Sequence, residues 1–190
     1  MNYSVPDLIL KWDAIIAINK EHHILESAFL QIYVAFEKDL NETFVLFSLG
    51  NSHTAYTPVR KLVFTAKDQL FEVIKGEGTF VDYSKAIDRC SKHIFVKNVF
   101  GQITSMTNYS SCLSQMKIVR NYLAHGSQES KEKYMKSVLN MPNNTRFMEP
   151  GEFLLTKTTK ANKTVYSQYI DCIEEIYNLL RNDAFLNSVS

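Results

Sequence analysis

The sequence is poor in the residues that interrupt secondary structure, with six glycines and four prolines among 190 residues. So few turn residues argue against a protein of many short strands and favour long helices. The three cysteines, Cys90, Cys112 and Cys172, are an odd number and form no CxxC pair. Neither a disulfide framework nor a zinc site is therefore expected, and we expect no metal and no cofactor.

The sequence also lacks a long apolar run. The longest near-apolar stretch, residues 24–36, is interrupted by Glu26 and is shorter than the roughly 20 residues that a membrane-spanning helix needs. The first residues show no basic segment followed by an apolar one, so no signal peptide is expected. These features predict a cytoplasmic protein with no membrane partner.

What the sequence does contain is enough apolar material for a core. Apolar residues make up 45% of the chain, and 12 Phe, 10 Tyr and one Trp are present. A net charge of +1 is far from that of a disordered polyelectrolyte. The length fits one domain, so we expect residues 1–190 to form a single domain.

Apolar residues recur at helical spacing along most of the chain, which predicts an all-α bundle of five or six main helices. The expected helices cover residues 7–19, 21–47, 59–74, 80–99, 110–124 and 162–180, with a shorter one at 130–139. Residues 141–145 predict a turn. Residues 146–158, with Pro150-Gly151 among threonines, predict a small extended or hairpin segment.

Charge is distributed unevenly along the chain. Residues 58–170 carry 17 Lys and Arg against nine Asp and Glu, whereas the segments on either side are acidic. A basic middle fits a polyanionic partner such as RNA, because Lys and Arg neutralise phosphates. Ordinary solvated helix surfaces would give the same pattern.

Common catalytic motifs are missing: the sequence has no GxSxG, HExxH, GxGxxG or phosphate-binding P-loop. His22 and His23 lie beside Glu21 and Glu26, a pairing that suits a metal. No further His, Cys or Asp cluster accompanies them, so ordinary surface histidines fit better.

One stretch combines a permanent cation with a titratable imidazole: Arg120-Asn121-Tyr122-Leu123-Ala124-His125, followed by Gly126. We call residues 120–125 the Arg-His motif. Asn121 and His125 are four residues apart, so the amide is placed to orient the imidazole. Arg120 is about 140° from His125 around an ideal helix, and a frayed last turn would bring the two together. Arginine binds phosphate and stabilises developing negative charge, and histidine transfers protons near neutral pH.

Several residues around the motif are candidates for contacts with a nucleic acid. Lys117, Lys131 and Lys133 are placed to follow a phosphate backbone, and Tyr122 is a candidate for stacking on a base. For each there is an ordinary alternative, a solvated lysine or a packed tyrosine. Lys157, Lys160 and Lys163 form a second basic stretch.

The Arg-His motif resembles that of the HEPN superfamily, small helical domains marked by Arg-x4-to-6-His with a polar residue after the arginine. The resemblance implies a metal-independent endoribonuclease in which two protomers pair with their motifs facing one cleft. It implies catalytic roles for Arg120 and His125, with Asn121 in support. The 2′-hydroxyl of the RNA attacks, leaving a 2′,3′-cyclic phosphate and a 5′-hydroxyl. Many such proteins are toxins or antiviral effectors restrained by an antitoxin or regulatory protein.

The sequence departs from one HEPN pattern. Toxins paired with nucleotidyltransferase antitoxins often carry a tyrosine two residues after the histidine, and here that residue is Ser127. This departure puts neutralisation by tyrosine modification in doubt. Two alternatives to an enzyme stay open: a non-catalytic HEPN-like module that binds RNA or a partner protein, and a helical adaptor with no nucleic-acid role.

Overall fold

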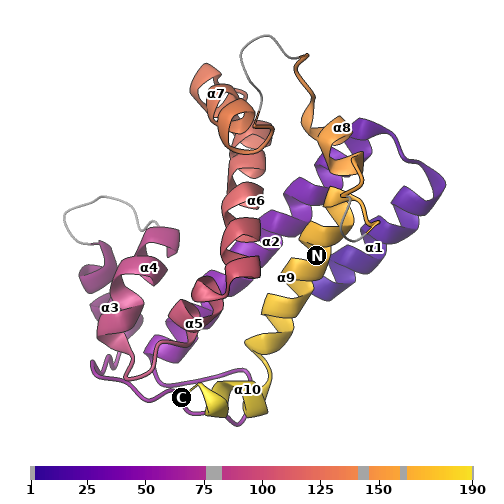
Figure 1. Ribbon diagram of the computed structural model, residues 1–190. Coiled ribbons are helices and arrows are strands. Elements are labelled where there is room, and N and C mark those ends of the chain that lie inside the picture. The colour runs from indigo at the N-terminus through magenta and orange to yellow at the C-terminus, as the bar shows by residue number, and fades with distance from the viewer. Residues whose placement is uncertain (1–2, 76–82, 141–145, 159–161, 190) are drawn as a thin grey trace. The chain divides into compact units, whose positions relative to one another are not determined.

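The computed structural model describes residues 3–75, 83–140, 146–158 and 162–189, and these ranges form ten helices and no β-strand (Figure 1). In chain order the helices are α1 (Val5–Ile18), α2 (His22–Ser48), α3 (Lys67–Lys75), α4 (Tyr83–Ile94), α5 (Val99–Ser105), α6 (Thr107–His125), α7 (Gln128–Ser137), α8 (Pro150–Leu155), α9 (Val165–Leu179) and α10 (Asp183–Ser188). The predicted all-α fold class is confirmed. Among these helices, none combines the length and the apolar character that a membrane crossing requires.

The chain divides into two compact units. Unit 1 comprises Met1–Phe36 and Ser111–Glu174, and unit 2 comprises Glu37–Ser110 and Glu175–Ser190. Helices α2, α6 and α9 contribute residues to both units. The Arg-His motif belongs entirely to unit 1.

The core of unit 1 is centred on the first half of α2. Phe29 is fully buried, and its ring centroid lies 5.7 Å from that of Tyr169 on α9. Fully buried side chains from the other helices of the unit complete this core: Met116, Tyr134, Leu154 and Ile173. Each such burial stabilises the fold by roughly 1.5–3 kcal/mol.

Residues 150–155 form helix α8, so the predicted extended or hairpin segment over 146–158 is wrong there. Pro150 occupies the first turn, where its missing N–H costs nothing and its fixed φ favours a helix. The Gly151 N–H donates to the Glu26 carboxylate of α2 at 2.8 Å. This contact between distant residues holds α8 beside the start of α2 (Figure 1).

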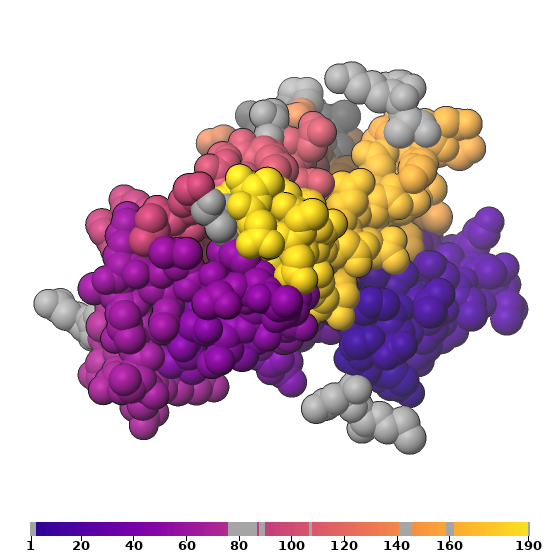
Figure 2. Space-filling view, turned by 90° about the horizontal axis from the view of Figure 1, so that it is seen from below, coloured from indigo at the N-terminus to yellow at the C-terminus, as the bar shows by residue number. Residues whose placement is uncertain are grey.

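The core of unit 2 is a group of phenylalanines. Phe100 on α5 lies 5.5 Å from Phe44 and 5.7 Å from Phe47 of α2, and 5.9 Å from Phe95, measured between ring centroids. In Figure 2, α10, coloured yellow, lies against purple residues of the same unit. There the Tyr56 N–H donates to Asp183 Oδ1 at 3.0 Å.

Two predicted helices in unit 2 are shorter than expected. The helix predicted over 59–74 begins only at Lys67, because the backbone before it pairs elsewhere: Arg60 forms an antiparallel bridge with Phe95. The Val96 N–H donates to Val59 O at 2.9 Å, which also ends α4 at Ile94 rather than at residue 99. A separate helix, α5, then begins after Asn98, whose side chain accepts from the Gly101 N–H.

The other predicted helices agree with the structure within a few residues: α1, α2, α6, α7 and α9. Helix α10 was not predicted; it begins after Asn182, whose side chain accepts from the Phe185 N–H. Residues 80–82 of one predicted helix and the predicted turn at 141–145 lie outside the described residues.

The C-terminal part of unit 2 is tied to α2 by a partly buried ion pair. Arg181 Nη2 lies 2.6 Å from Asp39 Oδ1, and the guanidinium carbon lies 3.6 Å from the Tyr177 ring centroid. His53 Nε2 lies 3.2 Å from Thr43 Oγ1, a hydroxyl on a fully buried residue. The charges of Arg181 and Asp39 both act on the imidazole of His53.

The pKa of His53 is lowered from its usual value of 6.5. Desolvation is the largest cause and the Arg181 cation adds to it, whereas the carboxylates of Asp39 and Glu42 act in the opposite direction. The unfolded chain therefore binds a proton at this position more readily than the folded chain does.

We expect the free energy of unfolding to decrease as the pH is lowered, because of His53. Its contribution is present above pH 6.5 and is lost as the pH drops through the folded pKa. His53→Gln, which keeps a polar partner for Thr43, should lose less stability than wild type between about pH 7.5 and about pH 5. Thermal unfolding of both proteins across this range measures the difference, and parallel curves would contradict the prediction.

Gly151 is expected to tolerate no larger residue. A Cβ at this position would lie 2.7 Å from the carbonyl oxygen of His22, which is backbone and does not yield easily. Gly151→Ala should destabilise the protein by about 1–3 kcal/mol, the usual cost of overpacking. The measurement is the midpoint of urea unfolding, and an unchanged midpoint would show that α8 moves away from α2 without penalty.

Candidate functional site

The seven candidate residues lie on two consecutive helices of unit 1. Lys117, Arg120, Asn121, Tyr122 and His125 lie on α6, and Lys131 and Lys133 lie on α7. Figure 1 shows α7 at the end of α6, joined to it by a short connection. All of the candidates except Lys117 thus lie on the last turns of α6 and on α7.

Helix α6 stays intact to its last residue. The Gly126 N–H donates to Tyr122 O at 2.9 Å, which closes the final turn, and Gly126 itself has φ +56°. A positive φ ends a helix and is adopted easily only by glycine. The Ser127 side chain then accepts from the Ser130 N–H and begins α7. His125 is therefore exposed at the junction of two well-formed helices.

The intact helix sets the relation between the arginine and the histidine. The frayed last turn that would bring them together is not present, so ideal helix geometry applies to residues 120–125. Five residues correspond to about 7.5 Å along the axis and about 140° around it. Within one copy of the chain, the two side chains therefore leave α6 in different directions.

Asn121 interacts with Arg120. The guanidinium Nη1 donates to Asn121 Oδ1 at 2.8 Å, and both residues are half-buried. Among the described side chains, no hydrogen bond joins Asn121 to His125. The carboxamide thus holds the cation of the motif in place, whereas the sequence pattern suggested that it orients the imidazole.

Tyr122 belongs to an aromatic cluster that joins the motif to the core. We define the aromatic cluster as Tyr122, Tyr134, Phe147 and Phe153. Tyr122 stacks on Tyr134, with ring centroids 5.3 Å apart and planes 13° apart, and Phe147 meets both rings edge-on at 6.1 Å. Tyr134 is fully buried, and Phe153 of α8 lies 6.1 Å from it. A buried ring thus fixes the orientation of a half-buried ring inside the motif.

The hydroxyl of Tyr122 faces a negative environment. Its pKa is raised, first by burial and then by the carboxylates of Glu149 and Glu26. Burial also raises the pKa of Tyr134, so both phenols stay neutral at physiological pH. Glu149 is exposed, and its side chain makes no capping hydrogen bond to α8.

The lysines near the motif differ in their surroundings. Lys131 Nζ lies 4.4 Å from the Phe147 ring centroid, a cation–π contact, and Lys133 is exposed. Lys117 is half-buried one turn before the arginine. Positively charged side chains therefore lie on both sides of the motif: Lys117 on α6, and Lys131 and Lys133 on α7.

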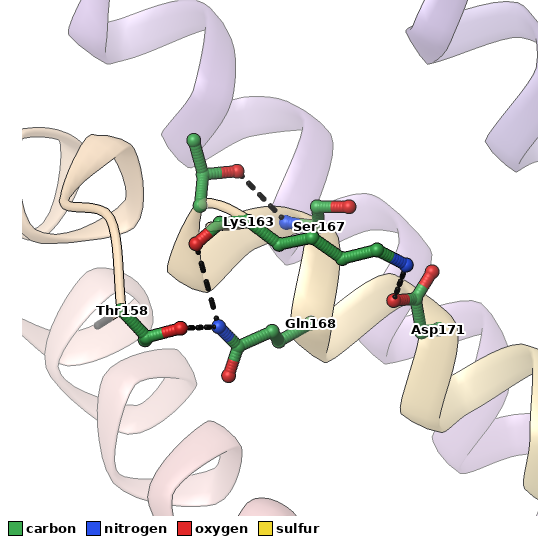
Figure 3. A network of polar contacts seen from close by, with 6 residues as sticks. Thr158, Lys163, Ser167, Gln168 and Asp171 are labelled. Carbon is green, nitrogen blue, oxygen red and sulfur yellow. Dashed lines mark hydrogen bonds and ion pairs between the residues drawn. The ribbon is translucent and has the colours of Figure 1, made fainter. Parts of the chain in front are cut away.

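The second basic stretch is part of a polar network at the start of α9 (Figure 3). Lys163 Nζ lies 2.6 Å from Asp171 Oδ2, which offsets its charge, and Lys157 is exposed at a bridge with Thr164. Gln168 Nε2 donates to Thr158 Oγ1. Lys160 lies outside the described residues.

Across the described ranges, His, Cys, Asp and Glu side chains form no group of three or more that would hold a metal ion. His23 Nε2 lies 3.3 Å from Glu21 Oε2, and both side chains are largely exposed.

The sequence pattern does not indicate that Tyr134, Phe147 and Glu149 lie near Tyr122. Phe147 lies 25 residues after Tyr122 and no periodic pattern links them, so only the folded chain brings these residues together.

Comparison with known proteins gave no match to a protein-family model, to a curated protein or to a solved structure.

Gly126 is expected to be required for the geometry of the motif. Gly126→Ala should cost about 1–2 kcal/mol, because an alanine is strained at this φ even though a Cβ would meet nothing within 4 Å. Gly126→Asn should cost less, since asparagine visits this region and Asn140 and Asn162 already have φ of 47° and 50°. Urea unfolding of the two variants gives both values, and an alanine variant as stable as wild type would contradict the assignment.

Proposed function

We propose that this protein is a metal-independent endoribonuclease of the HEPN type. The observation that carries the proposal is the placement of the Arg-His motif. A partly buried arginine held by a neighbouring amide and an exposed histidine lie at the end of one helix, beside a helix that carries lysines.

Each residue has a chemical role in this proposal. Arg120, positioned by Asn121, binds the scissile phosphate and stabilises the charge that develops on it. His125 is solvent-accessible and moves a proton to or from the reacting oxygens. The 2′-hydroxyl of the RNA attacks the adjacent phosphorus, the bond to the 5′-oxygen breaks, and a 2′,3′-cyclic phosphate and a 5′-hydroxyl are left. Lys117, Lys131 and Lys133 contact neighbouring phosphates.

Two copies act together in the proposed enzyme. One α6 directs Arg120 and His125 to sides about 140° apart, so a single copy does not hold both against one phosphate. A second α6 facing the first supplies the complementary group. This pairing is the arrangement that the HEPN resemblance implies, as is a cytoplasmic role as a toxin or antiviral effector under the control of a regulatory protein.

A non-catalytic module that binds RNA or a partner protein is the second candidate. The same separation of Arg120 and His125 favours it, and so does the hydrogen bond that engages the guanidinium with Asn121. Phosphate contacts without chemistry would give RNA binding that weakens steeply with salt.

The test is cleavage of labelled RNA by purified protein in EDTA, with analysis of the 3′ ends for cyclic phosphate. His125→Ala and Arg120→Ala should each lower the rate about 10²–10⁴-fold, the range for loss of acid–base or electrostatic catalysis. His23→Ala, which changes another exposed histidine of unit 1, should cleave as wild type does. Thermal unfolding establishes that each variant is folded.

Cleavage that persists in His125→Ala, or that EDTA abolishes, would refute the proposed mechanism. RNA binding with a steep salt dependence and no cleavage would identify the binding module instead.

A further inference from the structure

Two of the three cysteines lie on helices of unit 1 that are joined by a hydrogen bond. Cys112 is on α6 and Cys172 is on α9. The Tyr169 hydroxyl of α9 donates to Gln115 Oε1 of α6 at 3.3 Å. Because Tyr169 is buried, this hydrogen bond marks a point at which the two helices pack against each other.

Helices α6 and α9 run in opposite directions (Figure 1). A ring contact agrees with this arrangement: Tyr134 of α7, which follows α6, lies 6.1 Å from Phe153 of α8, which precedes α9. The end of α6 thus lies near the start of α9. A step toward the start of α6 and a step toward the end of α9 therefore lead in the same direction along the pair of helices.

The two cysteines are equally far along the chain from the hydrogen bond. Cys112 is three residues before Gln115, and Cys172 is three residues after Tyr169. Three residues correspond to about 4.5 Å along a helix axis and return to a neighbouring part of the same face. Since the helices are antiparallel, both cysteines lie about one turn from the hydrogen bond, on the same side of it. This register predicts that the two thiols face each other.

The surroundings of the Tyr169 hydroxyl agree with this register. Its pKa is raised, first by burial and then by the thiol of Cys112, with further effects from Tyr134 and Cys172. Electrostatic effects of this kind weaken with distance. Thiols from two different helices therefore lie near one phenol, and so near each other.

The cysteines of the pair differ in their access to solvent. Cys112 is half-buried, whereas Cys172 is buried, and both are present as thiols. A half-buried thiol is accessible to a small oxidant, and a buried thiol beside it reacts only after its neighbour has been oxidised. An accessible cysteine next to a resolving cysteine is the arrangement typical of redox-sensing pairs.

We propose that Cys112 and Cys172 are a redox modification site, at which hydrogen peroxide produces a reversible disulfide. The Cys112 thiolate attacks one peroxide oxygen, the O–O bond breaks, and the departing hydroxide takes up the thiol proton, which leaves a sulfenic acid and one water. The Cys172 sulfur then attacks the Cys112 sulfur, the S–O bond breaks, and the departing hydroxide takes the Cys172 proton. Two thiols and one peroxide give one disulfide and two waters.

This bridge is a response to an oxidant and not part of a structural disulfide framework, so it is compatible with a reducing compartment. The segment between the two cysteines contains the Arg-His motif, α7 and α8. Closing so long a loop restricts the unfolded chain and stabilises the folded one. The chemistry is independent of the proposed ribonuclease activity.

The experiment treats the purified wild-type protein with hydrogen peroxide and maps disulfides by mass spectrometry of the monomer band from a non-reducing gel. We expect a pair of peptides joined through Cys112 and Cys172, which dithiothreitol separates. Oxidation should also raise the midpoint of urea unfolding by about 1–2 M, the effect of a bridge that closes a loop of this length.

Cys90→Ser is the matched control, because Cys90 is the other half-buried cysteine but lies in unit 2. This variant should form the bridge and gain stability as wild type does, whereas Cys112→Ser should lose both effects. In Cys172→Ala, shown to be folded by thermal unfolding, the Cys112 sulfenic acid has no resolving thiol and should react with dimedone.

Absence of the joined peptides from oxidised, folded wild-type protein would overturn the proposal, and this result needs no variant. A bridge that forms only between two copies of the chain would overturn it as well. So would a bridge that does not raise the unfolding midpoint, because cysteines that face each other across α6 and α9 are joined without distorting the fold.

Discussion

The hydrogen bond from the Gly126 N–H to Tyr122 O, which closes the last turn of α6, is the interaction on which the candidate site depends. It keeps residues 120–125 helical to the end and thereby fixes the angle between Arg120 and His125. The same turn places Tyr122 and His125 on neighbouring parts of one face. The positive φ of Gly126 then allows the chain to begin α7 at once, so that a second helix with its lysines follows directly.

Stability and the proposed activity share the side chains of the aromatic cluster. Tyr134 is part of the buried core of unit 1, yet its ring is also the surface on which Tyr122 stacks. Phe147 contacts both the Tyr134 ring of that core and the cation of Lys131. A change in the core packing of α7 would therefore also move Tyr122 of the motif and Lys131, a lysine that is proposed to contact RNA. In contrast, the histidine of unit 2, His53, titrates in contact with Thr43 and near the Arg181–Asp39 ion pair, far along the chain from the motif.

The predictions from sequence succeeded where a helix buries one continuous apolar face and failed where backbone pairs with distant backbone. The helices corresponding to α1, α2, α6, α7 and α9 were predicted within a few residues, since their periodicity is local information. Residues 59–66 have an equally apolar pattern, but the bridge from Arg60 to Phe95 and the bond between Val96 and Val59 hold them out of a helix. Residues 150–155 form a helix whose start is secured by Glu26, a residue more than 100 positions earlier.

The same distinction applies to the candidate site. The sequence by itself determined the all-α class, the position of the Arg-His motif at the end of a helix and the presence of lysines on the next one, because spacing along one helix is sufficient for these. Only the tertiary structure decided that Asn121 pairs with Arg120, that the last turn is intact, and that Tyr134 and Phe147 surround Tyr122. Those features depend on side-chain rotamers and on which distant segments pack together. Contacts between separate helices cannot be inferred from the spacing of residues along one helix.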